Sequence, residues 1–156
     1  DWQRDAWVAE MVELIKPHAY FRWFDSGDLY NKRLGQKMLR ICQDTPDTKH
    51  WIPTRSWKIK GLQPILGALN SLPNVVVRSS EDKIDSDDWT VKNEHRSLII
   101  TDAASYKSSK GQVLCEAYSR KGKCGPCRAC WSKSVHTIQY PIHGGNALPQ
   151  LMKRNA

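Results

Sequence analysis

The stretch that decides the fold of this 156-residue sequence is Asn74-Val75-Val76-Val77-Arg78. Its three consecutive β-branched residues favour a strand. A strand with no polar residue between its apolar ones is typical of a parallel sheet whose two faces are covered by helices. We therefore expect residues 74–78 to form a buried strand of an α/β domain.

The segments on either side of this strand alternate between helix and strand signals. Apolar residues recur every three to four positions in the predicted helices, and β-branched or aromatic residues fill the predicted strands. The predicted helices are residues 2–16, 32–43 and 62–70, and the predicted strands are residues 20–24, 50–55, 74–78 and 97–101. This order predicts an α/β fold with a mainly parallel sheet. Right-handed crossovers allow an open doubly wound sheet or an arc of barrel, and we expect a partial (β/α) barrel.

Polar residues follow the predicted strands, at the edge where parallel strands end. Ligands bind beyond this edge in parallel sheets. The residues that we select for cofactor binding are Ser26, Gly27, Asp28 and Arg55, and residues 78–80 are expected to form the matching turn after the third strand. Two alternatives remain open. Asp28 can cap the following helix, and Arg55 can form a salt bridge within the domain.

The C-terminal part of the chain carries a cluster of cysteines. Cys115, Cys124, Cys127 and Cys130 follow the spacing C-x8-C-x2-C-x2-C. The glycines and the proline between them favour tight turns, so the four thiolates can face one point. We expect them to bind a metal centre, because so few and so clustered cysteines do not form a secreted disulfide framework. Cys42 stands apart on the apolar face of a predicted helix and is expected to be a buried structural thiol.

Two kinds of metal centre fit this spacing. The successive two-residue gaps resemble the C-x2-C-x2-C run of bacterial ferredoxins, which favours a four-iron four-sulfur (4Fe-4S) cluster. Zinc is the alternative, although structural zinc sites more often have two separated cysteine pairs. A further alternative is that His136 or His143 replaces one cysteine ligand. We expect the segment that carries these histidines and Tyr140 to fold over the metal.

The formal net charge is +8, and basic residues surround the cysteines. This distribution favours nucleic acid or another polyanion as a partner, with a basic protein that has no such partner as the alternative. We predict an α/β body at residues 1–106 and a metal-binding tail at residues 107–156 packed on it. No apolar run approaches the roughly 20 residues that span a membrane. No signal peptide is visible either. The clustered cysteines are typical of metal ligation in the cytosol, so we expect a cytoplasmic protein.

Three segments of the chain are specific in combination. They are RWFDSGDL at residues 22–29, TKHWIPTR at residues 48–55 and CGPCRACW at residues 124–131. Together they resemble the phage-encoded gene 88 protein family. The resemblance implies the cytoplasm of an infected bacterial host, but no particular activity. It also implies a further cysteine motif upstream of the first residue shown.

A weaker resemblance concerns a possible cofactor. The turn at Ser26, Gly27 and Asp28, between a strand and a helix, is similar to the Gly-Gly-Glu turn of radical S-adenosylmethionine enzymes. That turn follows the second strand of a partial barrel and holds the methionyl amine of S-adenosylmethionine. The resemblance implies that these three residues face this cofactor. Asp replaces Glu, Ser replaces the first Gly, and no C-x3-C-x2-C loop is present, so radical chemistry is not expected from this chain alone.

Two functional hypotheses follow. The first is an iron–sulfur protein that is related to the radical S-adenosylmethionine architecture, either as an enzyme or as a degenerate relative. The second is a zinc-stabilised nucleic-acid-binding module without catalysis.

Overall fold

The computed structural model describes residues 1–86, 93–101, 103–106 and 109–142. The chain divides into two compact units, Asp1–Ser79 (unit 1) and Ser80–Ala156 (unit 2). The predicted division into residues 1–106 and 107–156 rests on cysteine content rather than on compactness, and it stays a prediction.

Unit 1 alternates helices and strands in the predicted order. Its elements are α1 (Trp7–Ile15), β1 (Tyr20–Arg22), α2 (Lys32–Asp44), β2 (Lys49–Thr54), α3 (Gln63–Ser71) and the first part of β3 (Val75–Ile84). β1 pairs with β2, and β2 pairs with β3, both in parallel. The predicted α/β class with a mainly parallel sheet is therefore confirmed.

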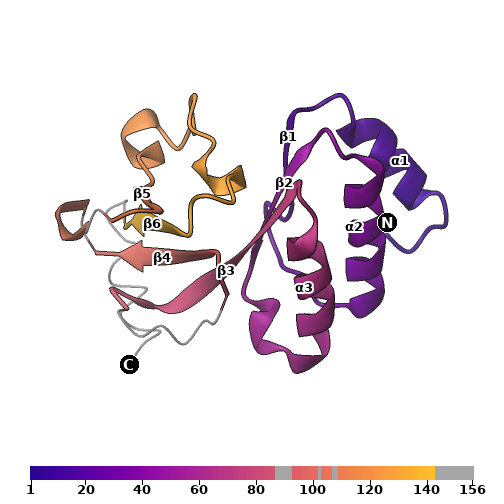
Figure 1. Ribbon diagram of the computed structural model, residues 1–156, viewed down its shortest axis with the longest axis horizontal. Coiled ribbons are helices and arrows are strands. Elements are labelled where there is room, and N and C mark those ends of the chain that lie inside the picture. Colours follow the sequence, from indigo (N-terminus) through magenta and orange to yellow (C-terminus); the bar gives the residue numbers. More distant parts are fainter. Residues whose placement is uncertain (87–92, 102, 107–108, 143–156) are drawn as a thin grey trace. The chain divides into compact units, whose positions relative to one another are not determined.

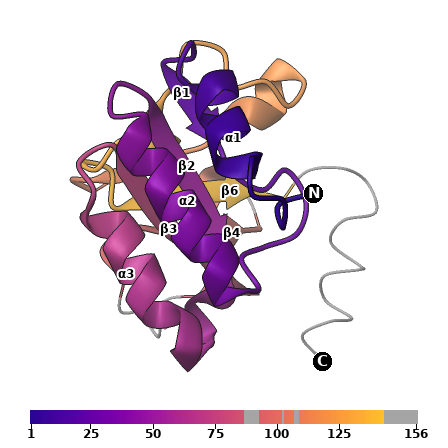
Figure 2. The same cartoon turned by 90° about the vertical axis from the view of Figure 1, so that its right-hand side faces the viewer.

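The three helices of unit 1 lie on the same face of its strands (Figure 1 and Figure 2). Val75 and Val77 belong to the hydrophobic core beneath these helices. Successive side chains of a strand point to opposite faces, so Val76 points away from them. The expectation that helices cover both faces of this strand is therefore wrong in unit 1. Helices on one face are typical of an arc of (β/α) barrel rather than of an open doubly wound sheet.

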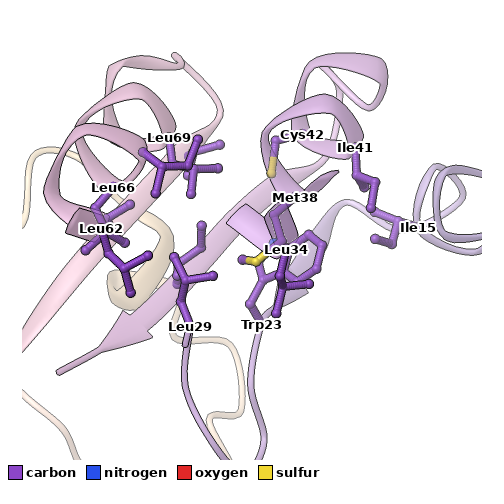
Figure 3. Close-up of a cluster of buried hydrophobic side chains, with 14 residues drawn as sticks. Ile15, Trp23, Leu29, Leu34, Met38, Ile41, Cys42, Leu62, Leu66 and Leu69 are labelled. Atoms are coloured by element: carbon purple, nitrogen blue, oxygen red, sulfur yellow. The ribbon is translucent and has the colours of Figure 1, made fainter. Parts of the chain in front are cut away.

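The sequence of α2 explains its place in this core. The Asn31 side chain caps the helix, because its oxygen accepts hydrogen bonds from the backbone N–H groups of Arg33 and Leu34 at 2.8 and 3.3 Å. Asp28 is therefore not the cap of this helix. The buried face of α2 meets α1, α3 and the strands (Figure 3), through Leu34, Met38, Ile41 and Cys42.

The main difference from the predicted elements lies in β3, which continues to Ile84. The polar residues at 78–80, predicted to form a turn, are part of this strand. Arg78 pairs with Pro53, and Ser79 pairs with Thr54. The prediction failed because a polar composition suggests a turn, whereas Arg78 and Ser79 are almost fully buried in the sheet.

Unit 2 is built on the end of β3 and on three further strands. These are β4 (Arg96–Ile100), β5 (Gln112–Leu114) and β6 (Thr137–Pro141). The hydrogen-bonded neighbours follow the order β3-β4-β6-β5, and β6 pairs in parallel with both β4 and β5. The cysteine-bearing segment therefore adds two strands that the sequence did not predict. Within the described residues, no helix has both the length and the apolar character needed to cross a membrane.

Candidate metal centre

The four C-terminal cysteines line one pocket of unit 2. Cys115 directly follows β5, and Cys130 lies in a 3-10 helix, Ala129–Trp131. Cys124 and Cys127 lie in the loop between these two positions and line the same pocket. Its apolar walls come from Val113, Ala117, Ala129, Trp131 and Ile138. The structure therefore brings together the four residues that the sequence selects as metal ligands.

A tight turn brings the loop cysteines to this pocket. The backbone N–H of Cys127 donates to the carbonyl oxygen of Cys124 at 3.2 Å, which closes the turn. Gly125, inside this turn, has a φ of 58°, and Gly122, before it, has a φ of 79°. Residues with a side chain rarely adopt these backbone angles, so glycine is favoured where the chain reverses direction.

Strand β6 positions the other two cysteines. The backbone N–H of Cys115 donates to the carbonyl oxygen of Gln139 at 2.8 Å, which extends the pairing of β5 with β6 by one residue. The hydroxyl of Tyr140 lies 3.3 Å from the Sγ of Cys130. Tyr140 therefore lies beside a predicted ligand, whereas the expectation that its segment folds over a metal stays a prediction. A hydroxyl that donates to a thiolate favours its charged, metal-binding form.

The four thiols are free of disulfides and differ in exposure. Cys130 is buried, Cys115 and Cys127 are half-buried, and Cys124 is exposed. Burial raises the pKa of Cys115, and the neighbouring Cys124 and Cys127 raise it further, whereas the positive charge of Arg120 lowers it. A metal cation has the opposite effect on such thiols, because it binds and stabilises the thiolate.

Basic side chains surround the pocket. Arg120 forms an ion pair with Glu116, with 3.1 Å between Nη1 and Oε2. Nη1 of Arg128 donates to two carbonyl oxygens of the cysteine loop at 2.7 and 2.8 Å, which braces the loop. Lys121 and Lys123 are exposed on the same loop. Positive charge next to a cluster of thiolates reduces their mutual repulsion.

The structure describes only one of the two histidines that the sequence offers as alternative metal ligands. His136 immediately precedes β6, at the opposite end of that strand from Tyr140, and it does not line the cysteine pocket. The four cysteines therefore form the pocket without it. His143 lies outside the described residues.

Cys42 is a buried structural thiol, as predicted. It is fully buried in the core of unit 1 (Figure 3). Burial raises the pKa of its thiol to about 12. A thiol with so high a pKa stays protonated and is a poor metal ligand.

The cofactor-binding residues that the sequence selects lie together in unit 1. Ser26, Gly27 and Asp28 line a pocket of about 410 Å³. The aromatic walls of this pocket come from Trp2, Trp7, Trp23, Phe24 and Tyr30. Arg55 is exposed, and its backbone N–H donates to an Asp28 oxygen at 2.7 Å. The polar turns after β1 and β2 therefore meet, as expected for the ends of neighbouring parallel strands.

The Asp28 carboxylate fastens these two turns to each other. Its Oδ1 accepts hydrogen bonds from the Thr54 hydroxyl at 2.6 Å and from the Leu29 N–H at 2.7 Å. Its Oδ2 accepts the bond from Arg55. These bonds give Asp28 a structural task that the sequence analysis did not foresee. Its partners Thr54 and Arg55 are far away in the sequence, so no local pattern reveals them.

A family model described as Gene product 88 matches residues 1–133, a range that includes all four clustered cysteines. No curated protein and no solved structure matches the chain significantly.

Proposed function

We propose that this chain, which belongs to the Gene product 88 family, is an iron–sulfur protein that holds a 4Fe-4S cluster on its four clustered cysteines. The family match confirms the resemblance to the phage gene 88 proteins, but its description names no activity. The proposal therefore rests on one observation: four cysteines from sixteen consecutive residues, none of them in a disulfide, line a single pocket.

The spacing supports a cluster over a single zinc ion. Structural zinc sites usually take two cysteine pairs from separate loops. Here Cys124, Cys127 and Cys130 come from one continuous segment that ends in a 3-10 helix, and Cys115 directly follows a strand. Three thiolates at successive two-residue gaps are typical of cluster ferredoxins. The apolar walls of the pocket also suit a cluster, because they limit access of solvent.

The first test is direct chemical analysis of protein purified without oxygen. We expect a brown protein with broad visible absorption and about four iron and four sulfide ions per chain. Anaerobic reconstitution with iron and sulfide should restore the same ratio after loss of the cluster. A colourless protein that carries one zinc ion per chain would contradict the proposal and support the zinc alternative.

A finer form of the proposal is that the chain is related to radical S-adenosylmethionine proteins, as an enzyme or as a degenerate relative. In this form unit 1 is part of a partial barrel, and unit 2 carries an auxiliary or sole cluster in its metal-binding tail. The aromatic pocket beside Ser26, Gly27 and Asp28 supports a cofactor that carries a positive charge, such as the sulfonium of S-adenosylmethionine, because aromatic faces attract cations. The compartment that we propose is the cytoplasm of the infected host.

A second candidate function is binding of nucleic acid beside the metal centre. The observation that favours it is the exposure of three basic residues, Lys121, Lys123 and Arg128, on the cysteine loop. Tyr118 is also 39% exposed in the same segment, and an aromatic ring among cations can stack on an unpaired base. A metal centre then has the structural task of holding this loop in shape.

The second test measures the salt dependence of binding to single-stranded DNA or RNA. Log affinity falls as log salt rises, and replacing Lys121 and Lys123 together by glutamine should make this fall less steep. The magnitude of the slope should decrease by about two, one for each lost phosphate contact. The matched control replaces Lys49 and Lys60, which are also exposed but lie in unit 1. An equal slope in both double variants would argue against the cysteine loop as the binding surface.

A further inference from the structure

A second group of metal-binding side chains lies at the other end of β6. β4 and β6 are parallel, and their register pairs Arg96 with Thr137. The residues just before these partners, His95 and His136, are therefore neighbours. Their rings are nearly parallel, with 7° between the planes and 6.0 Å between the centroids. The pairing of the two strands thus brings together two histidines that are 41 positions apart in the sequence.

A carboxylate completes the group. One ligand atom from each of Glu94, His95 and His136 lies within 4.8 Å of the others. His95 is 1% exposed, whereas Glu94 and His136 are exposed. The group is therefore anchored on a buried imidazole and open to solvent on one side, so a metal ion can enter without disturbing the core.

The hydrogen bond of His95 prepares it to bind a metal. Its Nε2 lies 2.9 Å from the carbonyl oxygen of Lys133. A carbonyl oxygen only accepts hydrogen bonds, so Nε2 carries the hydrogen and donates it. In the neutral ring the lone pair is then on Nδ1. A ring nitrogen that donates to a backbone carbonyl is the usual support of a metal-bound histidine, because it fixes the tautomer and the ring orientation.

The neighbouring strand holds His136 in place. The N–H of His136 donates to the carbonyl oxygen of Gly111 at 2.7 Å. Gly111 has a φ of 82°, and a Cβ atom at this position would lie 2.5 Å from Cδ2 of His136. Only glycine leaves room for the ring where it stands. The position of His136 is therefore set by the backbone as well as by its side-chain neighbours.

We propose that Glu94, His95 and His136 bind one divalent transition-metal ion of the zinc class, at a site separate from the cysteine centre. Two imidazoles and one carboxylate are the protein ligands of many open metal sites, in which the remaining positions hold water or substrate. The site does not depend on the proposed cluster. His136 immediately precedes β6 and Tyr140 lies within it, four residues further on, which corresponds to roughly 13 Å along an extended chain.

Lys133 provides an electrostatic test of the role of Glu94. The Lys133 ammonium interacts electrostatically with the carboxylate of Glu94. The two charges therefore attract each other. A metal ion that binds Glu94 must compete with this lysine, so removal of the Lys133 charge should strengthen metal binding. The carbonyl oxygen that supports His95 belongs to the backbone and remains in such a variant.

The experiment is a titration of the reduced, metal-free full chain with Co²⁺, followed by optical spectroscopy and metal analysis. Cobalt on the cysteines gives a strong thiolate charge-transfer band, whereas cobalt on imidazole and carboxylate does not. We expect one equivalent with this band and a second equivalent without it. The spectrum thus reports on the two sites separately. If the thiolate band alone is missing, the cysteine centre does not bind cobalt, and the second site is unaffected.

Four variants identify the ligands of the second equivalent. Loss of an outer partner of a metal ligand weakens binding by about 10–100-fold, so His136→Ala and Glu94→Gln, which remove a ligand, should weaken it by more than about 100-fold. Lys133→Met should tighten it several-fold. The control His18→Ala removes an exposed histidine from unit 1 and should change nothing.

The proposal is overturned if the second equivalent is missing, or if His136→Ala and Glu94→Gln both bind it as the unchanged protein does. Glu94→Gln keeps the size and shape of the side chain at an exposed position, so it decides the matter if His136→Ala fails to fold. An affinity that is unchanged or weaker in Lys133→Met would count against Glu94 as a ligand.

Discussion

We expect Cys130→Ala to abolish metal binding at the cysteine pocket, whereas Cys42→Ala should leave the iron and sulfide content of the protein unchanged. This pair is the sharpest expected result because both residues are buried cysteines and both changes remove the same sulfur atom. Cys130 lines the four-cysteine pocket, and its Sγ lies 3.3 Å from the Tyr140 hydroxyl. Cys42 packs among apolar side chains in unit 1.

The physical reason is the difference between a ligand and a packing group. A cluster held by three thiolates loses one iron–sulfur bond and exposes an iron atom to solvent, so we expect the cluster to be lost on purification. Loss of the Cys42 sulfur leaves only a small cavity, which should lower the free energy of unfolding by about 1–2 kcal/mol. The measurement is iron, sulfide and zinc analysis of both variants, together with urea unfolding curves.

The same pair also tests the zinc alternative. If the centre holds zinc, Cys130→Ala loses zinc instead of iron and Cys42→Ala keeps it, so the metal analysis separates the two metals. Equal metal content in the two variants would mean that Cys130 is not a ligand.

The stability of the chain should decrease by about 3 kcal/mol between pH 7 and pH 4 because of one residue, His50. The imidazole of His50 is fully buried in unit 1. Its Nδ1 accepts a hydrogen bond from the Trp23 indole at 3.2 Å, and its Nε2 lies 2.8 Å from the Thr45 hydroxyl. That hydroxyl donates to the carbonyl oxygen of Ile41 at 2.7 Å, so its oxygen accepts from Nε2. The bond from Trp23 requires the neutral ring, because a protonated Nδ1 cannot accept it.

The direction of the pH effect follows from this geometry. Burial lowers the pKa of His50 from 6.5 to about 4, with the Thr45 contact opposing the change. Below pH 6.5 the His50 ring binds a proton in the unfolded chain but not in the folded chain, so the free energy of unfolding falls as the pH falls. The contribution is fully present above pH 6.5 and is lost by about pH 4. Each unit of pKa difference corresponds to about 1.4 kcal/mol.

The variant His50→Gln isolates this contribution. Its amide offers one acceptor for Trp23 and one donor for Thr45, but it does not titrate. Urea unfolding, followed by tryptophan fluorescence at pH 7 and pH 4, should give a difference about 3 kcal/mol smaller in the variant. His18→Gln, at an exposed position, is the control and should keep the full difference. The same pH dependence in all three proteins would show that His50 does not cause it.

The sequence predicted those parts of the fold whose signals are local. α2 begins at Lys32 as expected and ends at Asp44, because its apolar residues recur at helical spacing. β5 and β6 were not predicted, because they have only three and five residues and contain glutamine or proline. Their stability comes from β6, which pairs with both β5 and β4 although these strands lie more than 20 residues before it in the sequence.

The candidate sites also divide into features that have a local signal in the sequence and features that have none. The four clustered cysteines are identified by their spacing alone, and the structure places them around one pocket. The Tyr140 hydroxyl beside Cys130 and the group of Glu94, His95 and His136 arise from strand register, for which the sequence carries no local signal. The hydrogen bonds of Asp28 likewise join turns that only the folded chain brings together.

The length of β3 has a genetic consequence. One continuous strand runs from unit 1 into unit 2, and the boundary between the units falls inside it, after Ser79. Side chains alternate between the two faces of a strand, so the deletion of a single codon just beyond this point inverts the facing of every later residue of the strand. A substitution here changes one side chain, whereas the deletion of one codon changes the facing of all later side chains of the strand. We therefore expect natural length variation in this family to avoid β3 and to fall in its loops.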